Sequence, residues 1–186
     1  MGELSSVDLL WHGPFSFETL LVDQKTRDTF SGKPGVYLWV VNQPTGPRIT
    51  YIGKASGRPD LIKRHLEHYR GYISGAYFIP AWALKSKTDW NVDPYNNEHV
   101  KSILFHRDKL CSFVAEAFDY TAHIQIFLAR ISPKHQAELH SIEKAMIYQE
   151  QPEENQRDKK SKPETEMQLH HRGETVWRQC SKNNPN

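Results

Sequence analysis

Two short apolar stretches decide the fold of this chain: Val36-Tyr37-Leu38-Trp39-Val40-Val41 and, after a loop, Ile49-Thr50-Tyr51-Ile52. The first stretch is rich in β-branched and aromatic residues, is too short for a helix and is apolar on both faces, so it predicts a buried strand. The loop at 42–48 carries two prolines and a glycine, and Gly53 ends the second stretch. Together they predict a β-hairpin with a longer loop.

Helical signals follow the hairpin. Pro59 suits the first position of a helix, and apolar residues recur from Ile62 to Ile73 at helical spacing, which predicts a helix over about 59–69. Residues 98–118 are expected to be mostly helical. Ser132-Pro133 predicts the start of a last helix that runs to about residue 149, because serine caps helices and proline suits their first turn.

Length and composition predict one α+β domain with extensions, since 186 residues suffice for one well-packed core. We expect a small three-stranded, largely antiparallel sheet flanked by helices, with strands near 35–41, 48–53 and 121–131. The expected parts of the chain are an N-terminal extension packed on the core at 1–33, the main domain at 34–155 with a helical and irregular insertion at 70–118, and a polar tail at 156–186.

The charge balance favours no class of partner. Lys and Arg outnumber Asp and Glu by only 24 to 22, so DNA affinity would need local basic clusters. Cys111 and Cys180 lie far apart in no zinc-binding pattern, so no disulfide framework is expected. No stretch reaches the roughly 18 apolar residues of a membrane span, and no secretory signal pattern begins the chain. We therefore expect a cytoplasmic protein with no membrane partner.

An ordered set of polar residues carries the candidate chemistry. Gly35-Val36-Tyr37 is followed fourteen residues after its tyrosine by Tyr51-Ile52-Gly53, and then by Lys54, Arg64, His68, Glu143 and Asn155. This combination, over residues 34–155, resembles the GIY-YIG nuclease superfamily, which includes excision-repair incision subunits, homing endonucleases and type II restriction enzymes. The resemblance implies the GIY-YIG fold and a divalent-metal-dependent endonuclease that hydrolyses phosphodiester bonds of DNA.

The resemblance makes one of the two tyrosines the general base on the attacking water, Tyr37 in preference to Tyr51. A phenol needs a lowered pKa for that task, and Lys54, Arg64 and a metal-bound water are expected to favour the phenolate. The alternative is that both are ordinary strand tyrosines that pack a ring and expose the hydroxyl.

Arg64 and His68 lie four residues apart on the predicted helix and share a face, which we expect to point away from the apolar stripe. In the family, the matching arginine clamps the scissile phosphate, and a histidine at the second position could relay a proton from the tyrosine. The alternative is a solvated basic helix face, shared with Arg58, Lys63 and Arg70.

Glu143 lies within an apolar helical stripe, where a carboxylate needs a partner. The resemblance makes it the single carboxylate that holds Mg²⁺ or Mn²⁺, and the alternative is a salt-bridged glutamate at the edge of the stripe. Asn155 would orient the active-site residues through hydrogen bonds, and the alternative is a polar loop residue.

The expected partner is double-stranded DNA. Basic residues expected to contact nucleic acid are Lys54, Arg58, Lys63, Arg70, Lys85 and Lys87. The insertion would be either a DNA-reading element or a packed cap. A type II restriction or defence nuclease acting as a homodimer is the favoured subclass. The alternatives are a structure-specific repair or recombination nuclease, a non-catalytic nucleic-acid-binding module, and an interaction protein that merely resembles the motif.

Overall fold

The protein is seen here as a computed structural model that describes residues 5–43, 46–74, 77, 79, 110–152, 154–155, 162–163 and 166–173. Its strands are β1 (Ser5–Phe15), β2 (Gly35–Gln43), β3 (Gly46–Ala55), β4 (Ile124–Arg130) and β5 (Met167–Gly173). They form one sheet in the order β3-β2-β4-β1-β5. Helices are α1 (Phe17–Val22), α2 (Gln24–Phe30), α3 (Leu61–Ile73), α5 (Leu110–His123) and α6 (Leu139–Glu150), with a 3-10 turn η2 (Pro133–Glu138) before α6.

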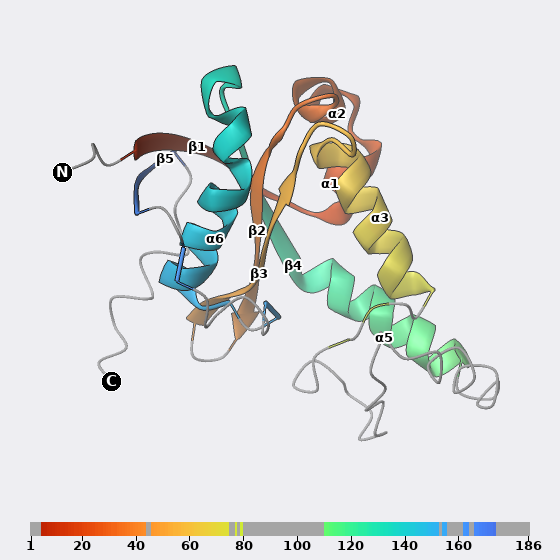
Figure 1. Ribbon diagram of the computed structural model, residues 1–186. Coiled ribbons are helices and arrows are strands. Elements are labelled where there is room, and N and C mark those ends of the chain that lie inside the picture. The colour runs from red at the N-terminus through yellow and green to blue at the C-terminus, as the bar shows by residue number, and fades with distance from the viewer. Residues whose placement is uncertain are drawn as a thin grey trace.

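Helices cover both faces of the sheet. In Figure 1, α6 lies on one side of β2 and β3, and α1, α2 and α3 lie on the other. Strand β2 alternates between two cores, because Val36, Leu38 and Val40 pack on the α6 side whereas Tyr37 and Trp39 pack on the α3 side. All residues from 35 to 41 are buried, which confirms the predicted buried strand.

The predicted hairpin is confirmed, and it carries an irregularity. Strands β2 and β3 are antiparallel, with Trp39 opposite Tyr51 but Val40 opposite Ile49, so Thr50 is an extra residue in β3. Residues two apart on a regular strand share a face. The bulge lets Tyr51 face α3 while Ile49 packs in the α6-side core.

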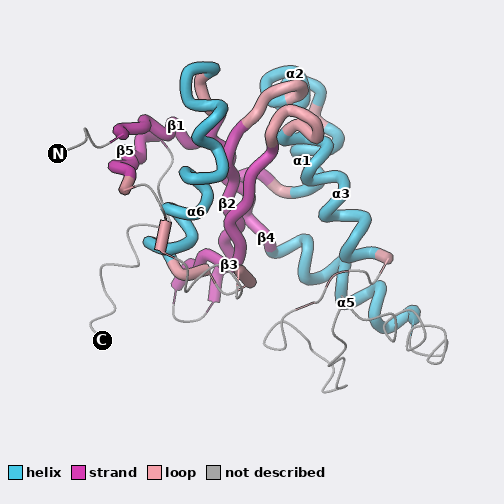
Figure 2. Tube along the Cα trace, viewed as in Figure 1, coloured by secondary structure: helices cyan, strands magenta, loops and turns pink. Residues whose placement is uncertain are grey.

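The α+β class is confirmed, but the prediction of three strands is wrong, because the sheet that the described residues form has five strands. Strand β1 pairs with β4 antiparallel and with β5 in parallel, so the sheet is mixed. Both added strands come from segments expected as an extension and a polar tail. Figure 2 shows them together beside α6.

Helix boundaries also differ from the predictions. Helix α3 begins after Asp60, whose carboxylate accepts from the Lys63 N–H at 2.8 Å, so Pro59 precedes the helix. Helix α5 runs on to His123, and the third predicted strand therefore begins three residues later than expected. Ser132 makes no side-chain cap and leads into η2 rather than directly into an α-helix. Within the described parts of the chain, no helix is long and apolar enough to cross a membrane.

Candidate active site

Two glycines let the predicted tyrosines fit into the sheet. Gly53 lies opposite Tyr37 across the hairpin, and a Cβ at Gly53 would overlap the Tyr37 hydroxyl and ring. Gly35 begins β2 where a Cβ would overlap the carbonyl of Ala129 on β4. The glycines of both tripeptides are therefore needed for close approach rather than for a left-handed backbone.

Tyr37 and Tyr51 face α3 side by side, with ring centroids 6.0 Å apart. Tyr37 has no exposed surface, and its hydroxyl lies 2.7 Å from Nε2 of His68. Tyr51 is partly exposed, and it lies within hydrogen-bonding reach of Tyr37. The Tyr51 phenol, the Tyr37 phenol and the His68 imidazole therefore form one cluster, because the His68 ring also lies 5.4 Å from the Tyr51 ring.

The expectation that His68 faces away from the core is wrong. His68 is 4% exposed, and its ring packs 4.9 Å from Trp39 and 5.4 Å from Tyr51. His65 is fully buried one turn earlier, where Nδ1 lies 2.7 Å from the Leu61 carbonyl. A carbonyl only accepts, so Nδ1 of His65 carries the proton and Nε2 accepts from the Trp39 indole N–H at 3.3 Å.

Both histidines are neutral in the folded protein. Burial lowers the pKa of His68 to about 2, with the charges of His65 and Arg64 acting in the same direction. Burial also lowers the pKa of His65 to about 4, although the hydrogen bond to Leu61 opposes it. An uncharged imidazole can accept a hydrogen bond from the Tyr37 hydroxyl, but the low pKa of His68 makes it a weak acceptor of the proton itself, which does not favour the expected proton relay.

The phenols do not have the lowered pKa that was expected. Burial raises the pKa of Tyr37 well above its usual value, with the Tyr51 phenol adding to the rise. Burial raises the pKa of Tyr51 to about 12, and Glu143 acts in the same direction. Arg64 lowers the pKa of both phenols, but its effect is smaller than that of burial. At neutral pH both hydroxyls therefore keep their protons.

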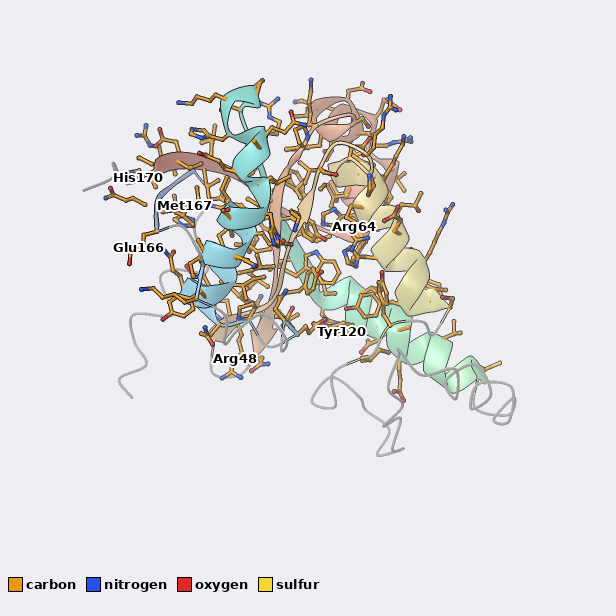
Figure 3. The ribbon with its side chains drawn as sticks, in the orientation of Figure 1. Arg48, Arg64, Tyr120, Glu166, Met167 and His170 are labelled. Atoms are coloured by element: carbon orange, nitrogen blue, oxygen red, sulfur yellow. The ribbon has the colours of Figure 1, made fainter. Side chains whose placement is uncertain are left out.

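Arg64 lies beside the phenols and remains reachable from solvent. Its side chain is 32% exposed, and Nη1 donates to Glu67 at 2.9 Å. Its charge and a side-chain hydrogen bond both lower the pKa of Tyr37. Figure 3 shows Arg64 between α3 and the β2–β3 hairpin. The guanidinium is therefore at the same place as the phenols, with surface left to meet an anion.

Glu143 reaches the same neighbourhood from α6. Its charge acts on the pKa of both Tyr37 and Tyr51, although α6 lies on the other side of the sheet from α3. The Glu143 carboxylate, 15% exposed, is in direct contact with the Lys54 ammonium. His140, one turn earlier, has Nδ1 2.9 Å from Lys54 Nζ and 3.5 Å from Glu143 Oε2. The salt-bridged alternative for Glu143 is thus present, and its partner is another predicted site residue.

The donors at Glu143 suit a divalent cation that keeps most of its water ligands. In the described parts of the chain, no group of three or more His, Cys, Asp or Glu side chains could hold a metal ion. A single carboxylate suits Mg²⁺ or Mn²⁺, which keep several water ligands, and does not suit a closed zinc site. The contact of Lys54 with Glu143 shows that the carboxylate already stabilises a positive charge at this point.

Asn155 is buried, 8% exposed, and holds β3. Its side-chain amide accepts from the Ile52 N–H and donates to the Ile52 carbonyl, each at 2.8 Å. Asn155 is thus a hydrogen-bonded part of the hairpin and not a free loop residue. It contacts the backbone of the residue between Tyr51 and Gly53.

The predicted DNA contacts are described only in part. Arg58, Lys63 and Arg70 are exposed at or on α3, as both the nucleic-acid and the solvated-face interpretations require. Lys85 and Lys87 lie outside the described residues, as does most of the predicted insertion.

Sequence reasoning missed several residues of this neighbourhood. His65 follows Leu61 and Ile62 at helical spacing, and His140 precedes Glu143 by three, so spacing alone could have indicated both. Glu154, whose carboxylate accepts from the hydroxyls of Tyr72 on α3 and Tyr120 on α5, has no such signal, because these partners lie far away in sequence. Comparisons of the chain with protein-family models, with curated proteins and with solved structures find no match. The assignment of function therefore depends on the geometry of the site.

Proposed function

We propose that this chain is an endonuclease that hydrolyses phosphodiester bonds of DNA with one divalent metal ion. One observation carries the proposal: two phenols, a guanidinium and a carboxylate come from different elements and lie close enough for the two charged groups to shift the pKa of both phenols. Tyr37 and Tyr51 come from the hairpin, Arg64 from α3 and Glu143 from α6. Ordinary strand tyrosines would not need a partly buried arginine and glutamate beside them.

The base is Tyr51, held in place with Tyr37 and His68. Tyr51 is the phenol that a water molecule can reach, whereas Tyr37 has no exposed surface. As water attacks phosphorus, Tyr51 acts as a phenolate and takes its proton. Arg64 lowers the pKa of Tyr51, and a divalent cation held by Glu143 would lower it further, while the hydrogen bond between Tyr37 and His68 holds the pair of phenols in place. This reassigns the group facing the water from Tyr37 to Tyr51.

Arg64 and Lys54 meet the phosphate. The partly exposed guanidinium offers paired donors that match two phosphate oxygens, and its charge is worth most in the transition state, where negative charge grows. Lys54 Nζ, next to Glu143, adds a second positive charge on the α6 side. Glu143 would hold Mg²⁺ or Mn²⁺, which supplies Lewis-acid stabilisation of the phosphate and the leaving oxygen.

Double-stranded DNA is the proposed substrate, and a type II restriction or defence nuclease acting as a homodimer is the proposed subclass. The exposed residues Lys63 and Arg70 lie on α3 together with Arg64, and the exposed Arg58 shortly precedes the helix; all three suit contacts to the DNA backbone. Such contacts position the duplex and carry no base preference, so the recognition sequence depends on other parts of the chain.

Cleavage of supercoiled plasmid with Mg²⁺ tests the proposal, with Arg64→Ala as the decisive variant and Arg27→Ala, an exposed arginine on α2, as the matched control. We expect Arg64→Ala to lose about a hundredfold or more in rate, and Arg27→Ala to cleave as the unaltered chain does. DNA binding without cleavage by the unaltered chain would indicate a binding module. Neither binding nor cleavage would indicate an interaction protein.

A further inference from the structure

The segment that follows α6 binds the outer edge of β3 on both sides of Tyr51. The backbone N–H of Glu154 donates to the carbonyl of Thr50 at 2.7 Å. Asn155 binds both backbone groups of Ile52. Thr50 is the extra residue of the bulge, so these contacts hold the irregular part of the strand that directs Tyr51 towards α3.

The side chain of Glu154 extends the same attachment to the helices. Its carboxylate accepts from the Tyr72 hydroxyl at 2.9 Å and from the Tyr120 hydroxyl. Tyr72 belongs to α3 and Tyr120 to α5, and they are 2% and 3% exposed. Burial, with the nearby charge of Glu154, raises the pKa of both phenols well above the usual value, so both keep the proton that they donate. Figure 3 shows Tyr120 between α5 and the sheet.

One residue thus joins three elements: the bulge of β3 through its backbone, and α3 and α5 through its carboxylate. A carboxylate among buried groups is costly unless its oxygens accept hydrogen bonds, so the distances between the three elements are closely restricted. Helix α3 also carries Arg64 and His68. Any shift of β3 against α3 would therefore move Tyr51 relative to both.

We propose that Glu154 is a positioning residue, clamped by Tyr72 and Tyr120, that sets Tyr51 against Arg64 and His68. The proposal rests on the proposed nuclease function, and it adds a group that does not itself touch the substrate. Glu154 acts through the placement of the phenol that faces the water. Misplacement of a reacting group by about 1 Å can cost on the order of a hundredfold in rate.

The test compares Glu154→Gln and Glu154→Ala with the unaltered chain. Glutamine keeps one acceptor oxygen, so its effect should be intermediate. The first readout needs no activity: proton NMR of the DNA-free protein at pH 7 measures the contact between the Tyr51 and His68 rings, whose centroids lie 5.4 Å apart. The second readout is kcat and KM for DNA cleavage. The controls are Tyr69→Phe, on α3 but away from Glu154, and Glu166→Gln at an exposed position.

We expect Glu154→Ala to weaken the Tyr51–His68 contact and to lower kcat about a hundredfold with KM within about twofold, whereas both controls leave contact and kcat unchanged. A purely structural role would lower the melting temperature while the folded fraction kept the ring contact and full kcat, and that result would overturn the proposal. If the unaltered chain cleaves no DNA, the nuclease function fails, and the ring contact alone decides whether Glu154 positions Tyr51.

Discussion

Replacement of Asn155 by alanine should destabilise the fold by an amount that the structure allows us to work out. The change removes two hydrogen bonds to Ile52, each 2.8 Å long, at a side chain that is 8% exposed. Two such bonds contribute about 2 kcal/mol together, and the loss approaches about 4 kcal/mol if the Ile52 N–H and carbonyl stay dry and unpaired. We expect a loss of about 3 kcal/mol, which lowers the melting temperature by about 10 °C for a chain of this size.

Urea unfolding followed by circular dichroism measures this loss, with Asn42→Ala, at an exposed strand position, as the matched control. Asn155→Asp is expected to be at least as destabilising as Asn155→Ala, because aspartate keeps the acceptor for the Ile52 N–H but places a second acceptor against the Ile52 carbonyl. A free energy of unfolding for Asn155→Ala within about 0.5 kcal/mol of Asn42→Ala would refute the reasoning, since changes of that size are ordinary for surface positions.

Three further predictions concern the residues around the phenols. Gly53→Ala should cost about 1–3 kcal/mol of unfolding free energy, because the new methyl overlaps the Tyr37 hydroxyl and ring; an unchanged denaturation midpoint would contradict this. Arg64→Lys should lower kcat about a hundredfold because lysine lacks the paired donors, and equal turnover in the plasmid assay would count against the phosphate role. The pKa values of His65 and His68 are lower in the folded chain than in the unfolded chain, so below about pH 6.5 the unfolded chain binds two protons that the folded chain does not bind. We therefore expect full stability above about pH 6.5 and a loss of about 3 kcal/mol of unfolding free energy by pH 5.5. Equal unfolding free energies at pH 7.5 and 5.5 would contradict this.

The hairpin could be predicted from sequence because its signal is local. The run from Val36 to Val41 is apolar on both faces, and only a central strand between two layers buries both. Strand β1 was missed although Val7, Leu9 and Trp11 alternate as buried residues, because the apolar but exposed Leu10 interrupts the alternation and Gly13-Pro14 is typical of a turn. Its assignment depends on pairing with β4 and β5, which lie far along the chain.

The buried face of α3 could not be found by counting apolar residues. Leu66, Tyr69 and Ile73 are only partly buried, whereas His65 and His68 are in the core. These histidines are tolerated there because their ring nitrogens find partners. His65 binds the Leu61 carbonyl within α3 and the Trp39 indole of β2, and His68 lies next to the Tyr37 phenol of β2. The sequence therefore predicted an exposed environment for His68, whereas the structure buries it.

The contacts that Glu154 and Asn155 make with β3 could also be predicted only in part. Asn155 was expected to orient its neighbours, and its amide does bind the strand next to Tyr51. Glu154, one residue earlier at the end of the expected main domain, was not singled out, and its partners Tyr72 and Tyr120 lie 82 and 34 residues away in sequence. No local pattern encodes such a contact, because it depends on how α3, α5 and the sheet pack together.

The most direct test of the central claim is the initial rate of plasmid nicking by the purified chain, with and without Mg²⁺, compared with Glu143→Gln and with Glu18→Gln at an exposed position of α1. Glutamine keeps the size of the side chain but removes the charge that would hold the cation. We predict nicking that requires Mg²⁺, a loss of about a hundredfold or more in Glu143→Gln and full activity in Glu18→Gln. Nicking by Glu143→Gln at the rate of the unaltered chain, or no nicking by the folded unaltered chain, would contradict the account.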